Sequence, residues 1–155
     1  MVKKFKKINK VALFSSKFNK NTLKITSQIE EVLKNIGIKV FFSRSFSSKG
    51  IAKGKIFSDM HIIKNSDLLI AVGGDGTLLS SARIFGSEGL PILGVNLGTV
   101  GFLTDINPEN LTSSLLEIVN GSFIKDERFF LKAKINAKVE KNIALNEIVI
   151  HSGVV

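Results

Sequence analysis

The fold of this chain is decided by residues 68–77, LLIAVGGDGT. The apolar half, Leu68–Val72, predicts a buried strand, and the glycines predict a tight turn into a helix over Thr77–Phe85. A buried strand, a glycine turn and a helix in this order are how α/β proteins hold a phosphate. Glycine has no Cβ to keep an anion away from the backbone N–H groups, and the positive end of the helix dipole points at the same place. We therefore predict that Gly73 and Gly74 bind a phosphate group.

Asp75 is the unusual member of this turn, because an acid among phosphate-binding amides must either take part in chemistry or hold a metal ion. The turn is not a Rossmann fingerprint, since the spacing G-x-G-x-x-G is absent, and not a P-loop, since no Gly-Lys-Ser/Thr follows it. The alternative is purely structural: a tight turn in which the glycines supply positive φ angles. The predicted strand before the turn and the predicted helix after it favour phosphate binding.

The composition is that of an ordinary globular protein, with 44% hydrophobic and 23% charged residues. The absence of cysteine excludes disulfides and cysteine metal sites, and no apolar stretch approaches the roughly 18 residues of a membrane span. The net charge is +9, but the lysines are scattered and no nucleic-acid-binding motif surrounds them. We expect a cytoplasmic protein that binds phosphorylated small molecules, with neither nucleic acid nor a membrane as its partner.

Apolar strands alternate with amphipathic helices as far as Gly121. This alternation predicts an α/β fold over residues 1–121, a Rossmann-like parallel sheet covered by helices on both faces. A segment rich in Ser, Lys and Gly after the second strand predicts a mobile loop. The predicted elements are strands over Lys10–Ser15, Ile38–Phe42, Leu68–Val72 and Pro91–Asn96, helices over Asn21–Ile36 and Ser58–Lys64, the loop over Ser43–Lys55, and a last helix that opens with an Asn107 cap and ends at Gly121.

The pattern changes after Gly121, and we predict that residues 122–155 begin an all-β domain. Residues 131–139 alternate apolar side chains with lysine or asparagine, which predicts one half-solvated antiparallel strand. A turn is predicted over Glu140–Asn142, and more strand over Ile143–Val155. Two or three strands do not form an independently stable sheet, so we expect this β domain to be incomplete.

Two further motifs follow the glycine turn. Residues 94–105, GVNLGTVGFLTD, lie at the carboxyl end of the fourth predicted strand, where ligands bind in open α/β sheets. Within this motif, Phe102 either contacts a ligand or simply fills the core. Asn146 and Glu147 interrupt an apolar strand and would be costly to bury without partners, so we expect them to face solvent, a partner or a ligand.

Together these three segments resemble one family, the NAD kinases. The family pattern is a Gly-Gly-Asp-Gly turn, then Gly-x-Asn-x-Gly-x-x-Gly-Phe-Leu-Thr-Asp, then Leu-Asn-Glu, and both order and spacing match here. The resemblance implies phosphoryl transfer from ATP to the 2′-hydroxyl of the adenosine ribose of NAD, giving NADP. It implies NAD and ATP as partners, with Mg²⁺ arriving with the ATP, and a homo-oligomer when the protein is full length.

The resemblance also implies roles for individual residues. Asp75 looks like the family's catalytic residue, which accepts the proton of the ribose hydroxyl as that hydroxyl attacks the γ-phosphate. No residue is assigned to a metal. The other contacts that the resemblance implies are Gly73 and Gly74 as the phosphate turn, and Gly76, Asn146, Glu147 and Phe102 as residues that bind NAD beside Asp75.

NAD kinases continue through a Thr-Pro-Thr-Gly-Ser-Thr segment that lines the dinucleotide site, and this sequence does not contain that segment. We therefore expect the chain to be the amino-terminal part of such an enzyme and to be inactive, or nearly so, by itself. Two alternatives stay open: a lipid kinase of the diacylglycerol class, which shares the Asp-bearing turn, and a non-catalytic nucleotide-binding remnant. The phosphoryl donor, ATP or polyphosphate, is also open.

Overall fold

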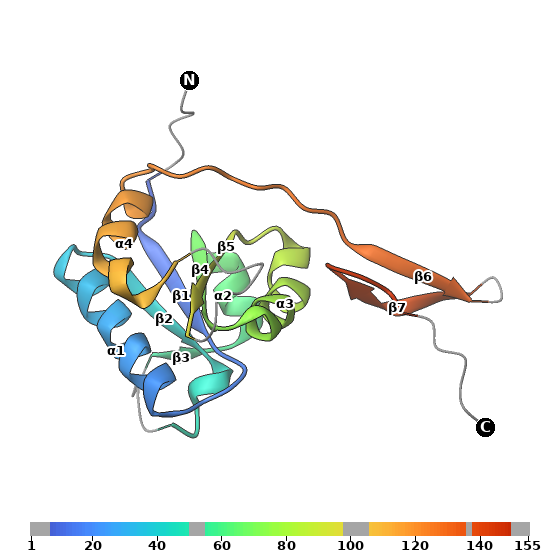
Figure 1. Cartoon of the computed structure of the whole chain (residues 1–155), viewed down its shortest axis with the longest axis horizontal. Coiled ribbons are helices and arrows are strands. Elements are labelled where there is room, and N and C mark those ends of the chain that lie inside the picture. The colour runs from blue at the N-terminus through green and yellow to red at the C-terminus, as the bar shows by residue number, and fades with distance from the viewer. Residues whose placement is uncertain (1–6, 50–54, 98–105, 136–137, 150–155) are drawn as a thin grey trace. The chain divides into compact units, whose positions relative to one another are not determined.

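The computed structural model describes residues 7–49, 55–97, 106–135 and 138–149, the last strand pair partly by its backbone alone. The chain divides into two compact units, Met1–Ile124 and Lys125–Val155 (Figure 1). Among the described residues, no helix is both long enough and apolar enough to cross a membrane.

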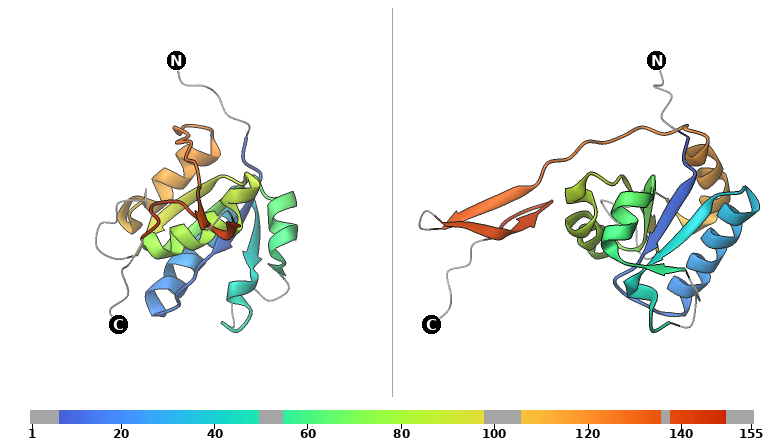
Figure 2. Two further views of the ribbon diagram at one scale, coloured as in Figure 1. Left: turned by 90° about the vertical axis from the view of Figure 1, so that its right-hand side faces the viewer. Right: turned by 180° about the vertical axis from the view of Figure 1, so that it is seen from behind.

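The first unit is built on a five-stranded sheet in the order β3-β2-β1-β4-β5, and every neighbouring pair of strands runs parallel (Figures 1 and 2). The chain builds outward from β1 to β3, then returns to the other side of β1 and adds β4 and β5. The predicted α/β fold with a parallel sheet is therefore confirmed. The strands are β1 (Lys10–Phe14), β2 (Lys39–Ser43), β3 (Ile56–Phe57), β4 (Leu68–Gly73) and β5 (Ile92–Asn96).

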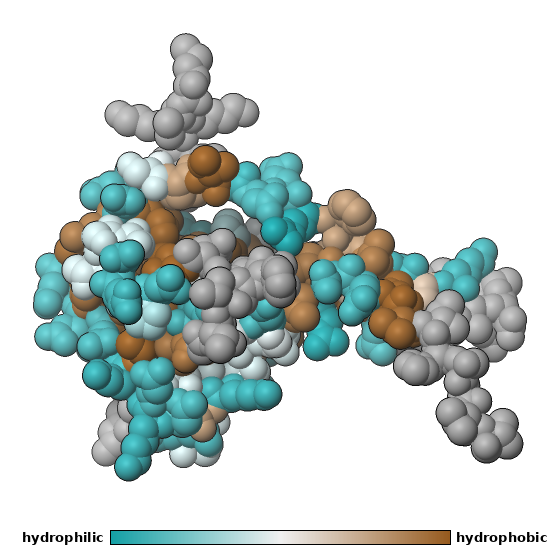
Figure 3. All heavy atoms as spheres, in the orientation of Figure 1, coloured by the Kyte–Doolittle hydropathy of each residue, from teal (hydrophilic) through white to brown (hydrophobic). Residues whose placement is uncertain are grey.

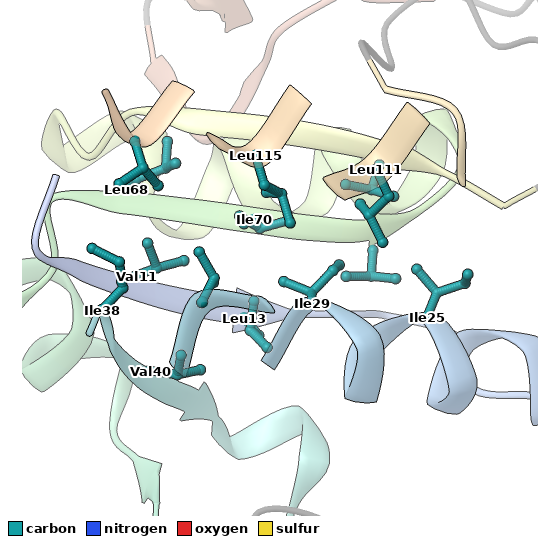
Figure 4. Packing of buried hydrophobic residues seen from close by; sticks show 14 of the residues in the cluster. Val11, Leu13, Ile25, Ile29, Ile38, Val40, Leu68, Ile70, Leu111 and Leu115 are labelled. Atoms are coloured by element: carbon teal, nitrogen blue, oxygen red, sulfur yellow. The ribbon is translucent and has the colours of Figure 1, made fainter. Parts of the chain in front are cut away.

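Helices cover both faces of this sheet. On one face, α1 (Lys20–Asn35) and α4 (Leu111–Val119) pack their apolar stripes against alternate residues of β1, β2 and β4, as Figure 4 shows for Ile29 and Leu115 over Leu13 and Ile70. The other face is covered by α2 (Asp59–Asn65) and by α3 (Asp75–Ile84) with the residues that follow it. Burial on both faces explains why β4 reads as a continuous apolar run.

The ends of α1 follow from its sequence. The Asn19 side chain precedes the helix and accepts a hydrogen bond from the backbone N–H of Thr22 at 2.8 Å. Gly37 follows the helix in the left-handed region at φ +77°, where a side chain would be strained, and its N–H donates to the carbonyl of Lys34 at 2.9 Å. The prediction of Gly37 as the stop of this helix is confirmed.

The prediction of a mobile loop over Ser43–Lys55 was wrong for its first residues, Ser43–Phe46. Ser43 ends β2, and Arg44–Phe46 form a 3₁₀ turn, η1, in which Phe46 is completely buried. The ring of Phe46 packs edge-on against those of Phe42, at 5.2 Å between centroids, and Phe18, at 5.0 Å. This one apolar anchor outweighs the polar composition around it. Sequence reasoning also missed the short edge strand β3.

The last helix of the first unit opens differently from the prediction. Pro108–Asn110 form a 3₁₀ turn, η3, and the Asn107 side chain makes no capping hydrogen bond. The backbone N–H of Asn110 donates instead to the carbonyl of Asn107 at 3.2 Å, which closes a turn tighter than an α-helix. The predicted position of Asn107 is confirmed, because this residue stands at the N-cap of η3 with Pro108 in the first turn, but the expected capping bond of its side chain is not formed. The predicted stop at Gly121, with φ +84°, is confirmed.

The second unit contains an antiparallel hairpin of β6 (Leu131–Ile135) and β7 (Lys138–Ala144). Ile135 pairs with Lys138, so the chain reverses there, and the predictions of one strand over 131–139 and a turn at Glu140–Asn142 were wrong. Alternation has the same period in both arms of a hairpin, so it cannot locate the turn. The predicted strand over Ile143–Val155 was also wrong for residues 145–149, which follow β7 without strand structure, and residues 150–155 lie outside the described part.

Apolar side chains lie on the surface of the second unit. Phe129 is 79% exposed, Val149 66% and Ile148 44%. Figure 3 shows brown, hydrophobic residues at the surface there, among teal hydrophilic ones. A two-stranded hairpin has too little partner surface to bury such side chains. That residues 122–155 begin an incomplete β domain stays a prediction.

Candidate active site

The strand order places the candidate site. β1 and β4 are neighbours, and the chain leaves β1 for the helix on one face of the sheet and β4 for the helix on the other. In open α/β sheets, a crevice forms outside the carboxyl ends of the strands at such a reversal, and ligands bind in it. The segment after β1 begins with Ser15 and Ser16, and the segment after β4 is the glycine turn.

The glycine turn is shorter than the sequence suggested. β4 continues to Gly73, Gly74 is the residue before the helix, and α3 begins at Asp75 rather than at Thr77. The carbonyl of Gly74 accepts the backbone N–H of Thr77 at 2.9 Å and that of Leu78 at 3.2 Å, which closes the first turn. Asp75 therefore lies in the first turn of a helix, where the dipole favours a carboxylate and, equally, a phosphate.

The glycines of the turn are not there for positive φ. Gly74 has φ −98°, and the positive-φ glycines among the described residues are Gly37, Gly89 and Gly121. The purely structural explanation of the turn is therefore wrong in its stated form.

Close packing and open space explain the glycines instead. A Cβ on Gly73 would lie 2.7 Å from Cβ of Thr77, and still closer to its hydroxyl oxygen, so Gly73 is required by packing. A Cβ on Gly74 or Gly76 would meet nothing within 4 Å. These two glycines therefore leave a bare backbone surface on either side of Asp75, against which a ligand can lie. Binding of phosphate by Gly73 and Gly74 stays a prediction.

The segment after β1 reaches the glycine turn through a side-chain hydrogen bond. Oγ of Ser16 lies 2.8 Å from Oγ1 of Thr77, across 61 residues of sequence. The segment is itself held from within: Ser15, which is fully buried, donates its hydroxyl to the carbonyl of Lys17 at 2.9 Å, and the Thr22 hydroxyl donates to the same carbonyl at 3.3 Å. Sequence reasoning missed Ser16, whose only signal was a pair of serines directly after an apolar strand.

The second motif begins at the carboxyl end of β5. Asn96 is buried, and its backbone N–H donates to the carbonyl of Ile106 at 2.9 Å, while the N–H of Ile106 donates to the carbonyl of Gly94 at 3.1 Å. The motif therefore leaves β5 and returns to it. Phe102 lies outside the described residues, and its predicted contact with NAD stays a prediction.

Asn146 and Glu147 belong to the second unit. Both are exposed, as expected for polar groups that would be costly to bury, although they follow β7 and do not interrupt a strand. Their predicted contact with NAD stays a prediction. Of the predicted site residues, the structure places Gly73, Gly74, Asp75 and Gly76 together at the end of β4.

Metal ligands do not cluster in the described part of the chain: it contains no group of three or more His, Cys, Asp or Glu side chains that could hold an ion. His61, the histidine of this part, lies on α2 with its ring stacked on Phe57 at 4.5 Å between centroids and edge-on to Phe41 at 5.5 Å. The ring thus belongs to an aromatic cluster of the sheet edge.

Comparison with solved structures places this fold among kinases of nicotinamide dinucleotides. The chain superposes on the yeast NADH kinase in complex with NADH with a TM-score of 0.70, 18% identity, and coverage of 90% of this chain and 46% of that one. It superposes on the NAD kinase of Archaeoglobus fulgidus in complex with ATP with a TM-score of 0.54, 26% identity, and coverage of 84% and 45%. At the first of these identities, the likeness shows the fold alone.

Comparison of sequences points to the same proteins. The NAD kinase of Buchnera aphidicola subsp. Baizongia pistaciae is 38% identical over 125 residues, which are 78% of this chain and 43% of that protein. The NAD kinase of Pseudomonas entomophila is 42% identical over 90 residues, 56% of this chain and 30% of that protein. The chain thus spans less than half the length of these relatives. The model of the ATP-NAD kinase N-terminal domain matches residues 9–123, most of the chain including the glycine turn, and the chain therefore belongs to the ATP-NAD kinase family.

Proposed function

We propose that this chain supplies the nucleotide-binding part of an NAD kinase, which transfers a phosphoryl group from ATP to the 2′-hydroxyl of the adenosine ribose of NAD and so produces NADP. One observation carries the proposal: Asp75 stands in the first turn of α3, at the reversal of strand order, between two glycines with open space beside them. This arrangement offers a carboxylate to a hydroxyl and bare backbone to phosphates at the same place.

Asp75 would act on the ribose hydroxyl. Its carboxylate accepts a hydrogen bond from the 2′-hydroxyl, orients the oxygen lone pair toward the γ-phosphorus, and takes the proton as the O–P bond forms and the bond to ADP breaks. A carboxylate is a weak base toward an alcohol, so orientation contributes more than deprotonation, and the proton moves late. The α3 dipole and the backbone of Gly74 and Gly76 stabilise the charge that gathers on the phosphoryl oxygens.

Mg²⁺ fits this site as a companion of ATP. The described residues contain no group of three or more carboxylates or other such ligands, so the cation would be held by phosphate oxygens and water. When bound, it neutralises the transferring phosphoryl group. We also propose that Asn146, Glu147 and Phe102 contact NAD, a role that the exposure of the first two supports.

The family membership disfavours the lipid kinase, because the matching relatives are NAD kinases. It also makes the cytoplasm, where NAD and ATP are both present, the compartment that we propose, and a homo-oligomer the assembly that we propose for the full-length protein. A non-catalytic remnant is the alternative that an experiment must decide.

The deciding experiment measures NADP formation from NAD and ATP by two proteins: this 155-residue chain and the longest open reading frame that contains it. We expect turnover from the longer protein and little or none from the chain alone. Asp75→Asn in the longer protein should lower kcat by a factor of at least about 100, because it removes the group that orients the nucleophile. Absence of turnover from the longer protein with any phosphoryl donor would favour the remnant, and full activity of Asp75→Asn would refute the role of Asp75.

A further inference from the structure

We propose that Ser16 is a positioning residue for Asp75, acting through Thr77. This inference rests on the proposed function, since it concerns the same glycine turn. The hydroxyl groups of Ser16 and Thr77 lie 2.8 Å apart, and this hydrogen bond ties the segment after β1 to the first turn of α3. Thr77 is two residues beyond Asp75 in that turn.

Thr77 has little freedom to move. Its side chain is only 4% exposed and packs directly on the backbone of Gly73, where even a methyl group would collide with it. Its backbone N–H donates to the carbonyl of Gly74 at 2.9 Å. Thr77 therefore contacts Gly73 through its side chain and Gly74 through its backbone, the two residues directly before Asp75. A shift of Thr77 as a whole would loosen the first turn of α3, which carries the carboxylate.

Ser16 is the partner that fixes the rotamer of Thr77. A threonine can present its hydroxyl or its methyl group in a given direction, and a hydrogen-bonding partner selects the hydroxyl. Ser16 can make this selection because its own segment is anchored: the adjacent Ser15 is buried and bonded to the carbonyl of Lys17, and Phe18 packs on the buried Phe46. The hydrogen bond therefore joins the turn to a segment that is already held in place.

Loss of the hydrogen bond between Ser16 and Thr77 should reduce stabilisation of the transition state more than it weakens substrate binding. A carboxylate that wanders by a fraction of an ångström still meets a bound hydroxyl, but it no longer directs the lone pair at phosphorus. We expect Ser16→Ala and Thr77→Val, each of which removes one hydroxyl with little change of shape, to lower kcat by about fivefold. The KM values for NAD and ATP should change by less than about twofold.

The experiment measures kcat and both KM values for Ser16→Ala, Thr77→Val and the double variant in the longest reading frame that contains this chain. The double variant should be no slower than either single variant, because both remove the same bond. Ser16→Thr should restore kcat, since it keeps the hydroxyl. Ser113→Ala is the matched control: it removes a serine hydroxyl that donates to the carbonyl of Asn110 at 3.0 Å, on α4, and should leave all three constants unchanged.

A second measurement keeps the test independent of folding. In the 155-residue chain, amide hydrogen exchange of Thr77 and Leu78, whose N–H groups close the first turn of α3 on the carbonyl of Gly74, should become faster in Ser16→Ala, while that of β5 should not change. If Asp75→Asn abolishes turnover and Ser16→Ala leaves kcat intact, the proposed function stands and the positioning role of Ser16 is refuted. A rise in KM alone, or losses from the two single variants that add up in the double variant, would also refute it. Full activity of Asp75→Asn would instead defeat the proposed function.

Discussion

In the first unit, the strands of the parallel sheet begin at one side, here called the amino edge, and end at the opposite side, the carboxyl edge. These two sides are held by different kinds of interaction. At the amino edge, the carboxylate of Asp67, the residue before β4, accepts the backbone N–H groups of Asn9 at 3.0 Å and Lys10 at 2.9 Å, where β1 begins. At the carboxyl edge, the connecting segments rest on buried aromatic rings and meet through small residues and hydroxyls. At the amino edge, the charged carboxylate of Asp67 holds the start of β1 beside the start of β4. At the carboxyl edge, glycines leave the backbone uncovered beside Asp75. A site for an anion needs the second arrangement, because side chains would cover its amides.

Phe46→Ala tests whether this buried ring supports the segments at the carboxyl edge. Of the variants proposed here, we expect it to lower the free energy of unfolding most. The ring is fully buried against Phe42 and Phe18, so its removal leaves a cavity under the segment after β1. We expect the free energy of unfolding to fall by about 4 kcal/mol in urea titrations of this chain, followed by far-UV circular dichroism. Phe129→Ala, at a site that is 79% exposed, is the control and should change it little. A loss below about 1 kcal/mol for Phe46→Ala would mean that the ring is not the anchor of this edge.

Gly73 and Gly74 separate packing from ligand access within the same turn. Gly73→Ala should lower the free energy of unfolding by about 2–3 kcal/mol, because its Cβ would overlap the buried side chain of Thr77. Gly74→Ala adds the same atom in open space and should cost far less. In the longer reading frame, Gly74→Ala should nevertheless impair turnover, since the new methyl group would stand where a phosphate must approach. Equal losses of stability from the two variants would contradict this division.

The sequence predicted the strands of the sheet and the helix α1 better than the turns and connections at the ends of the strands. Apolar runs and helical periodicity predicted the parallel strands and α1, because burial on both sides of a sheet leaves a strong pattern. The start of α3 at Asp75 was missed, since glycine has a low helix propensity and hides the first turn of a helix. The hairpin of the second unit was misplaced because its two arms carry the same alternation.

The candidate site was predictable only where it is local in sequence. The glycine turn and its acid are contiguous and stood out, whereas Ser16 meets Thr77 across 61 residues and leaves no local pattern. Phe46 was hidden for a related reason: its burial depends on Phe18 and Phe42, which come from other elements. The roles of Ser16 and Phe46 depend on contacts between segments that are distant in sequence. Neither composition nor periodicity reveals such contacts.

Asp67 tests the amino edge. Asp67→Ala removes the acceptor of two backbone N–H groups at the start of β1, and we expect the free energy of unfolding to fall by about 2 kcal/mol. Asp67→Asn keeps one carbonyl oxygen and should lose about half as much. Because this residue lies at the opposite end of β4 from Asp75, neither variant should change kcat in the longer protein. A fall in kcat at temperatures where the variant is folded would show that the two edges are not independent.

Glu30 on α1 gives the smallest expected effect and the one that depends on pH. Its Oε1 accepts the ammonium groups of Lys34 at 2.7 Å and Lys55 at 2.9 Å. Burial alone would raise the pKa of Glu30, but these two hydrogen bonds outweigh it and hold the pKa below its ordinary value of 4.5. The ionised form is therefore favoured by folding, so its contribution is complete above the ordinary pKa and disappears as the pH falls through the lowered one.

Glu30→Gln should accordingly lower the free energy of unfolding by about 0.5 kcal/mol at neutral pH, the scale of a partly exposed ion pair. The difference from the unchanged protein should shrink as the pH falls below 4.5 and vanish once Glu30 is protonated in both states. Glu31→Gln removes the same charge at the next, exposed position of α1 and is the matched control, which should leave the free energy of unfolding at neutral pH nearly unchanged. Urea titrations of the three proteins between neutral and acidic pH measure this directly. A difference that persists or grows in acid would mean that Glu30 stabilises α1 through packing of its methylene groups and not through its charge.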